Sequence, residues 1–195
     1  MTSIDERNGD PLEEMTRIAH SYLNLASWGF NESYRSAKPE ILIYDSEWCR
    51  VKLIWGGWDY LGGNSIHIRY GRLHAPNEKV TMFWSGEECR CWHDFNQVLH
   101  FLDGRAPAEA AKLRYSHPIT APFYEESFRQ EFHRRQPEWL AQMHVTIWQH
   151  YGTRFFELFD VCRPELWDQY RQFLKEVYDI EGRSPAIKPP LDKVC

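Results

Sequence analysis

The most reactive side chains of the chain lie close together in one short segment. Cys89, Cys91 and His93 occupy alternate positions, and Asp94 follows directly. Thiolates and imidazole are preferred ligands of Zn²⁺, and a thiol beside a histidine can act as a nucleophile. The segment therefore raises two chemical possibilities, which are a metal site and a small thiol hydrolase.

The spacing of these residues argues against both possibilities. Structural zinc sites usually place two residues between paired cysteines, whereas one residue separates Cys89 from Cys91. On a strand, the β-carbons of Cys91 and His93 would stand about 7 Å apart, too far for direct transfer of the thiol proton. Cys49 could supply a further metal ligand, but buried free thiols are the simpler interpretation. We expect no cofactor, and the chain has no nucleophile elbow, phosphate-binding glycine loop or HExxH pattern.

A second group of candidate residues is basic and aromatic. In two segments, basic residues alternate with apolar ones, as on a strand with one buried face. The apolar set is Val51, Leu53, Ile66 and Ile68. The opposite set is Arg50, Lys52, His67 and Arg69, to which a third segment adds Arg90 and Trp92.

This basic face could bind a phosphate, a carboxylate or an acidic protein segment, because arginine forks onto planar anions. The alternative is a face that is solvated or covered by acidic residues of a helix, since one face of an antiparallel sheet is usually wet. Near it, the glycine-rich segment 56–63 carries Trp58. That segment is either a mobile loop that brings an aromatic ring to a ligand or a long hairpin loop.

Five short segments with strand-like patterns must position these residues. They are residues 41–44, 49–55, 66–70, 80–84 and 89–93. The connections between them are short, which predicts an antiparallel up-and-down meander. Asp94 would then cap a helix that ends at Gly104. If segment 41–44 is an edge strand, it could pair with a second copy of the chain.

Helical periodicity predicts one helix before the sheet and several after it. The first starts at Asp10 and Pro11 and runs to about Gly29, and residues 31–40 form a polar connection. The later helices are residues 107–113, 123–133, 136–151 and 164–180, whereas 155–161 is ambiguous. We therefore predict an α+β fold in which a helical C-terminal half packs on one sheet face.

We predict one domain over residues 11–183, a disordered segment at 1–10 and an extended tail at 184–195. The tail contains three prolines, Pro185, Pro189 and Pro190, which a helix does not tolerate. A chain of 195 residues fits one such domain without disulfides or metals to support it.

Composition narrows the function classes. The net charge of −5 makes nucleic-acid binding unlikely and does not favour an anionic membrane surface. No run of 18 apolar residues predicts a membrane span, and the polar N-terminus is not a signal peptide. The five cysteines are an odd number, which indicates free thiols in a reducing cytoplasm.

The aromatic fraction is high, at 15%, and includes nine tryptophans. Most of these rings should fill a core between sheet and helices, and some could form a binding surface. Because no catalytic pattern is specific, we expect a non-enzymatic cytoplasmic protein that binds a protein or a small anionic ligand through its basic sheet face. The alternative is a small hydrolase or metal-dependent enzyme centred on Cys89, Cys91 and His93.

Overall fold

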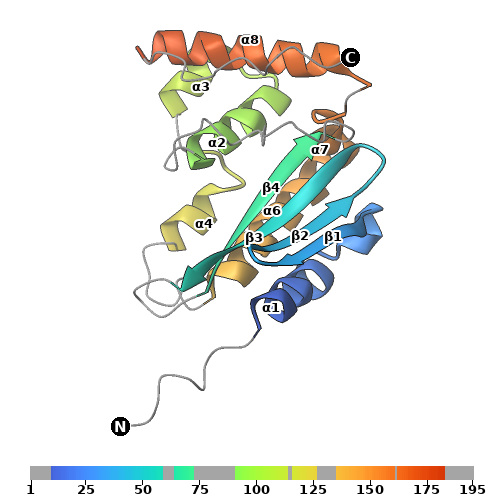
Figure 1. The fold of residues 1–195 in the computed structure, drawn as a ribbon. Helices are drawn as coiled ribbons and strands as arrows, with labels where there is room; N and C mark the ends of the chain where they lie inside the picture. The colour runs from blue at the N-terminus through green and yellow to red at the C-terminus, as the bar shows by residue number, and fades with distance from the viewer. Residues whose placement is uncertain are drawn as a thin grey trace.

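The computed structural model describes residues 10–58, 64–72, 91–113, 116–126, 135–160 and 162–182. Within these residues, four strands form one antiparallel sheet in chain order (Figure 1). They are β1 (Asn31–Ala37), β2 (Glu40–Asp45), β3 (Cys49–Trp58) and β4 (Asn64–Arg72). The predicted α+β class is confirmed, with four strands instead of five. Residues 1–9 and 183–195, which carry the predicted disordered N-terminus and tail, lie outside the described residues.

Two parts of the strand prediction are wrong. Residues 31–37 form the edge strand β1 instead of a polar connection, and all of them except Ser36 are exposed. Residues 91–93 belong to helix α2 (Cys91–Leu102), so the predicted strand 89–93 is wrong from Cys91 onward. Asp94 lies inside this helix and does not cap it. The predicted strand 80–84 and Cys89 lie outside the described residues.

The end of α2 follows the prediction. Gly104 has φ +71°, a conformation that glycine adopts without steric cost. The Arg105 N–H donates to the His100 carbonyl at 3.1 Å, and the Gly104 N–H donates to the Phe101 carbonyl at 2.9 Å. This pair of bonds is a Schellman motif, which satisfies the last carbonyls of the helix.

The predicted N-terminal helix is divided into three pieces. α1 (Pro11–Arg17) begins where the Asp10 carboxylate accepts the Leu12 N–H at 2.9 Å. A π-helical turn, η2 (Ile18–Tyr22), continues it, and Asn24 at φ 49° separates that turn from the 3₁₀ turn η3 (Leu25–Trp28). The helical start is therefore confirmed, whereas a continuous helix to Gly29 is wrong.

The remaining helices form the C-terminal half. They are α3 (Pro107–Leu113), α4 (Ala121–Glu126), α6 (Gln136–Tyr151), α7 (Thr153–Glu157) and α8 (Pro164–Ile180). The predicted bounds of α3, α6 and α8 are confirmed, and α7 occupies the start of the segment that was ambiguous. None of the described helices is long and apolar enough to cross a membrane.

The sheet has helices on one face. α1 packs against β2 and β3, and α6 packs against β4 and η2. In Figure 1, α6 lies behind the sheet, and no described helix crosses in front of it. α3 and α8 pack against each other beyond the end of the sheet (Figure 1). We call the face opposite α6 the outer face.

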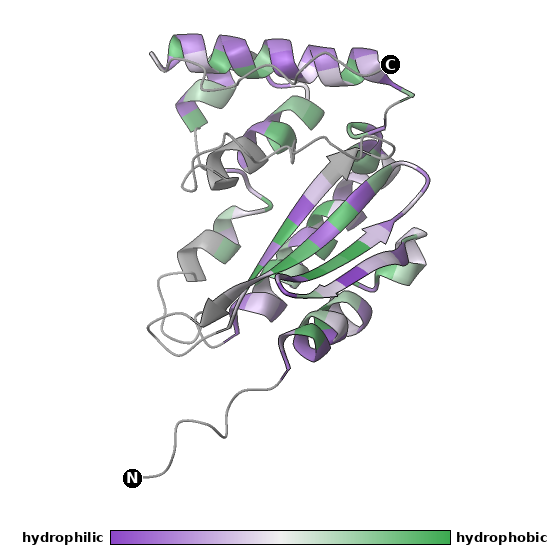
Figure 2. Ribbon diagram, viewed as in Figure 1, coloured by the Kyte–Doolittle hydropathy of each residue, from purple (hydrophilic) through white to green (hydrophobic). Residues whose placement is uncertain are grey.

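The predicted core face is confirmed, because the apolar set of β3 and β4 is buried. Its members are Val51, Leu53, Ile66 and Ile68. Hydrophobic and hydrophilic residues alternate along these strands in Figure 2. Much of the aromatic content also fills the core, where Trp148 contacts Phe156 at 5.5 Å and Tyr70 contacts Phe155 at 5.0 Å between ring centroids.

Candidate functional site

The register of the sheet arranges the outer face in rows that run across the strands. In one row, Tyr34 of β1 lies opposite Ile43, Ile43 opposite Lys52, and Lys52 opposite Arg69. The next row is Ser36, Ile41, Ile54 and His67. Residues in a row are neighbours on the same face. The first row therefore changes from apolar on β1 and β2 to basic on β3 and β4, whereas the second row has two isoleucines between Ser36 and His67.

Arg50 belongs to this face, but its charge is already balanced. Its Nε donates to Asp45 Oδ1 at 2.7 Å, and its Nη2 donates to Asp45 Oδ2 at 2.9 Å. Asp45 lies directly opposite Arg50 on β2, so a neighbouring strand supplies the carboxylate. The other members of the predicted basic set that the structure places on this face are Lys52, His67 and Arg69, which we call the basic half of the outer face.

Lys52 lies between two arginines. Arg69 is its cross-strand neighbour, and within the described residues no carboxylate forms an ion pair with Lys52. Burial lowers the pKa of the Lys52 amine, and the positive charges of Arg69 and Arg50 lower it further. Like charges directly opposite each other destabilise a sheet. An anionic group bound over Lys52 and Arg69 would relieve that repulsion.

His67 packs closely against a bulge in β3. The register shifts between Trp55 and Gly57, so Gly56 is an extra residue opposite β4. A β-carbon on Gly56 would lie 2.8 Å from Ser65 Oγ and 2.9 Å from His67 Nε2, so these side chains would have to shift to admit one. Desolvation, and then the charge of Arg69, lower the pKa of His67. The ring is therefore neutral near pH 7.

The apolar half of the outer face consists of Tyr34, Ile41, Ile43 and Ile54. The isoleucines are half-buried, and Tyr34 is 52% exposed. None of the four was predicted as a site residue. The alternation along β3 places Ile54 on this face, but Ile41, Ile43 and Tyr34 join it only through the pairing of β1 and β2, which the sequence pattern does not reveal.

The other predicted binding residues are only partly located. Trp58 is the last residue of β3 and Trp92 is the second residue of α2, and both side chains lie outside the described part of the chain. Arg90 and residues 59–63 of the glycine-rich segment lie outside it as well. Because Trp92 is helical, strand alternation does not place it beside Lys52.

The cysteine and histidine segment does not have the strand geometry that was predicted for it. Cys91 and His93 lie in α2, where alternation on a strand does not apply. Cys49 is buried in β3, and burial raises the pKa of its thiol, which disfavours the thiolate form. In the described part of the chain, no group of three or more histidine, cysteine, aspartate or glutamate side chains could hold a metal ion.

A polar cluster lies inside the helical half. His117 Nδ1 accepts the Ile119 N–H at 3.3 Å, so His117 Nε2 carries the proton that it donates to Asp103 Oδ2 at 3.0 Å. Tyr151 donates its hydroxyl proton to Asp103 Oδ1 at 2.7 Å. Both nitrogens of His117 are thus engaged, and its side chain is 2% exposed. The cluster holds α2 and α6 together and offers no free nitrogen to a substrate or metal.

His100 lies beside this cluster, with its ring centroid 5.1 Å from that of His117. The side chain is fully buried, and neither ring nitrogen has a hydrogen-bond partner in the described part of the chain. Burial, and then the neighbouring His117, lower the pKa of His100 to about 4. This histidine is therefore neutral in the folded protein.

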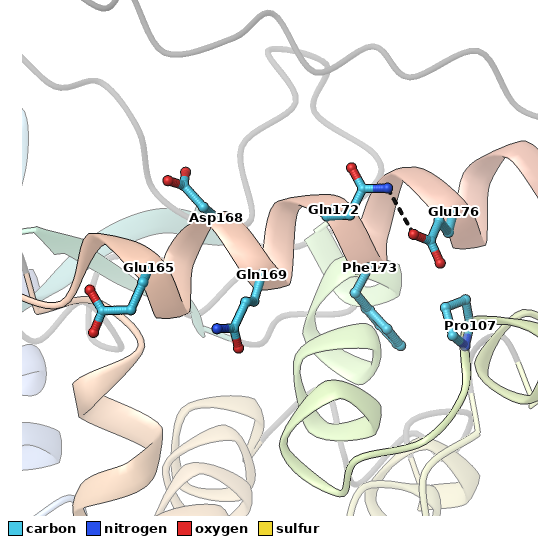
Figure 3. A pocket seen from close by; sticks show the side chains of 7 residues that line it. All are labelled: Pro107, Glu165, Asp168, Gln169, Gln172, Phe173 and Glu176. Carbon is cyan, nitrogen blue, oxygen red and sulfur yellow. Dashed lines mark hydrogen bonds between the residues drawn. The ribbon is translucent and has the colours of Figure 1, made fainter.

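An open hollow of about 570 Å³ runs along α8. Its acidic residues are Glu165, Asp168 and Glu176, and Gln172 donates to Glu176 at 2.7 Å (Figure 3). Phe173 and Pro107 supply apolar surface at one end (Figure 3). Solvated carboxylates on a helix face do not specify a ligand, so this hollow is a weaker candidate than the outer face.

Comparison with known proteins adds no functional assignment. No protein-family model, curated protein or solved structure matches the chain. The geometry of the outer face is therefore the basis on which we propose a function.

Proposed function

We propose that this chain is a non-enzymatic binding protein that takes an acidic partner protein on the outer face of its sheet. The observation that carries the proposal is the row in which Lys52 lies opposite Arg69, beside isoleucines on a face that no described helix covers (Figure 1). Such a surface combines an apolar area with positive charge, of which Lys52 has no ion-pair partner among the described residues. These two features give a protein interface its affinity and its orientation.

The overall charge of the chain makes this basic area distinctive. With a net charge of −5, most of the surface repels an acidic partner, so attraction concentrates at Lys52 and Arg69. Electrostatic complementarity of this kind speeds encounter and rejects wrong partners. Contact with the isoleucines would then slow the dissociation of the partner, because apolar contact is favourable in proportion to the area that it removes from water.

The proposal is tested by reversing the two charges. We expect the double variant Lys52→Glu and Arg69→Glu to lose the proteins that the wild-type chain captures from a native extract. The control is Lys112→Glu with Lys175→Glu, which makes the same change of charge at exposed positions of α3 and α8. A partner identified in this way must also bind the purified wild-type chain directly, with an affinity that falls as salt concentration rises.

Two results would contradict the proposal. In the first, both double variants capture the same proteins as the wild type. In the second, both lose them equally, which would show that net charge and not the outer face matters. Circular dichroism and the midpoint of thermal unfolding show whether each variant is folded, so a folding defect is not mistaken for a binding defect.

A further inference from the structure

The hollow along α8 is lined by a polar stripe that follows the helix axis. Glu165 and Glu176 are about three turns apart, so they lie on the same side of α8. Gln169 and Gln172 occupy the turns between them, and Asp168 flanks the stripe. At a rise of about 1.5 Å per residue, the two glutamates are separated by roughly 17 Å along the axis.

The charges at the two ends of this stripe are not balanced within the described part of the chain. Neither Glu165 nor Glu176 forms an ion pair there, and Glu176 accepts only the neutral amide of Gln172 (Figure 3). Phe173 and Pro107 add apolar surface about one turn from Glu176. A segment that fits the hollow therefore needs two cations about 17 Å apart and an apolar stretch beside one of them.

The chain itself carries such a segment directly after α8. Residues 183–195, which lie outside the described residues, include Lys188 and Lys193, with Pro189 and Pro190 immediately after the first lysine. An extended proline-rich chain rises about 3.1 Å per residue, so positions 188 and 193 would be separated by roughly 16 Å. This separation matches that of the two glutamates.

We propose that residues 183–195 run back along α8, antiparallel to it, and occupy the hollow. Lys188 then pairs with Glu176, and Lys193 pairs with Glu165. The carboxylates alone do not specify a ligand. The match in charge, spacing and direction between the hollow and the adjoining segment is what specifies this one.

The end of α8 favours this direction. Gly182 has φ +66°, the left-handed conformation in which helices commonly end, and its N–H donates to the Asp179 carbonyl at 3.2 Å. Pro185 then prevents the helix from continuing. An extended chain can span roughly 19 Å from Gly182 to Lys188, whereas the helix axis rises only about 9 Å between Glu176 and Gly182. The segment is therefore long enough to reverse and reach Glu176.

The two prolines meet the apolar part of the hollow in this register. Pro189 and Pro190 fall about one helical turn before Glu176, at the level of Phe173, and proline-rich segments pack well on aromatic surface. The contact is small, but a short tether gives an effective concentration of about a millimolar. Contacts too weak to hold a free peptide, or the same segment of a second copy, can thus keep the hollow occupied within one chain.

The test locates Cys195 with a nitroxide spin label in the full chain. Serine replaces Cys89, Cys91 and Cys162, whereas Cys49 is buried and is left in place. In the proposed register Cys195 lies near the start of α8, so the label should broaden the ¹H–¹⁵N signals there more than those at the end of the helix. A segment that continues away from α8 would broaden the end of the helix most.

Charge reversal tests the two ion pairs. Lys188→Glu with Lys193→Glu should abolish the broadening at the start of α8, and so should Glu165→Lys with Glu176→Lys. Combining the two pairs of changes should restore the broadening, because each ion pair is then formed with its charges exchanged. Circular dichroism shows whether each variant is folded.

The control is Glu13→Lys with Glu47→Lys, which makes the same change of charge at exposed positions on α1 and between β2 and β3. It should leave the broadening unchanged, and an equal loss in this control would overturn the proposal. Broadening that survives the reversal of either set of charges would overturn it as well.

Two further results would also overturn the proposal. Equal broadening at both ends of α8 would show that the segment takes no fixed position on the helix. Broadening of ¹⁵N-labelled chains by spin-labelled chains mixed with them would identify a second copy as the source of the segment. The charge-reversal variants and the control leave the outer face unchanged, so their results do not depend on the function proposed above.

Discussion

At the scale of single residues, one side chain pairs with the backbone of β4, the last strand of the described sheet. Gln136, the first residue of α6, accepts the Ile66 N–H at 3.1 Å and donates to the Ile66 carbonyl at 3.3 Å. A primary amide thus takes the place of a neighbouring strand at Ile66 on β4. Unpaired edge groups invite pairing with other chains, so Gln136 protects this edge and also fixes the start of α6 against the sheet.

The contribution of this contact can be measured with Gln136→Glu. The carboxylate keeps the shape of the amide but cannot donate, so the Ile66 carbonyl would face a second acceptor. We expect the free energy of unfolding to fall by about 1 kcal/mol, the usual cost of a lost hydrogen bond in a partly buried site. Urea unfolding monitored by tryptophan fluorescence measures this loss of stability.

The matched control is Gln142→Glu, because Gln142 is exposed on the same helix. Its free energy of unfolding should change by no more than about 0.5 kcal/mol. Equal effects at both positions would mean that charge in α6, and not the contact with Ile66, sets the stability.

At the scale of elements, the bulge in β3 positions the basic half of the outer face. Gly56 lets β3 bend so closely over Ser65 and His67 that a β-carbon would meet both. Bulges increase strand twist and redirect side chains. The orientation of the His67 side chain on the outer face therefore depends on glycine at position 56.

Gly56→Ala should therefore destabilise the β3–β4 hairpin by about 1–3 kcal/mol, the range for forcing extra atoms into a close-packed site. Thermal unfolding measures the loss, and hydrogen exchange at residues 65–70 should quicken locally. Adding Ser65→Ala should restore part of the stability, because it removes the oxygen at 2.8 Å but leaves the Ser65 carbonyl at 3.1 Å. A fully stable Gly56→Ala variant would show that the hairpin relaxes without strain.

The same elements show what sequence reasoning can and cannot predict. Alternation correctly separated Val51, Leu53, Ile66 and Ile68 from Lys52 and Arg69, because one buried face leaves a strong period of two. β1 was missed because an edge strand whose residues are almost all exposed carries no such period. Residues 91–93 were assigned to a strand because three alternating side chains are too few to distinguish a strand from the first turn of a helix.

Strand register and long-range contacts account for the rest of what was missed. The Glu32 and Arg35 ion pair at 2.9 Å depends on the β1 register shift between Glu32 and Tyr34, which puts residues three apart on one face. The Gln136 contact joins residues 70 apart in sequence. Neither the ion pair nor the Gln136 contact has a local sequence signal. The apolar half of the outer face has none either, because its rows can be identified only when the strand register is known.

At the scale of the whole molecule, His144 joins the sheet to the helical half, and two more buried histidines lie inside that half. Tyr70 of β4 accepts the Trp148 indole N–H at 3.0 Å, and its hydroxyl oxygen is hydrogen-bonded to His144 Nδ1 at 2.6 Å. Burial lowers the pKa of His144 to about 3. His117 also has a lowered pKa, mainly through burial and despite the opposing effect of Asp103. With His100 at about 4, these histidines are neutral in the folded state.

This arrangement predicts acid sensitivity with a definite sign. An unfolded histidine takes up a proton near pH 6.5, whereas the folded pKa values are lower, so below pH 6.5 the unfolded state binds more protons. Stability is therefore intact above about pH 6.5 and falls as the pH drops toward the folded values. Each buried histidine contributes at most about 1.4 kcal/mol per pH unit. Urea unfolding between pH 7.5 and 5 measures the combined loss of stability from these histidines, because most carboxylates titrate below this range.

His100→Leu isolates one contribution. Because both ring nitrogens of His100 lack partners in the described part of the chain, an apolar side chain of similar size removes two unsatisfied groups and breaks no hydrogen bond. We expect the variant to match or exceed the wild type in stability at pH 7.5. Its advantage should grow by about 1 kcal/mol for each pH unit below 6.5. If the free energy of unfolding depends on pH equally in the two proteins, His100 takes up its proton in the folded state. Local opening of the helical half would then have to admit water to the ring.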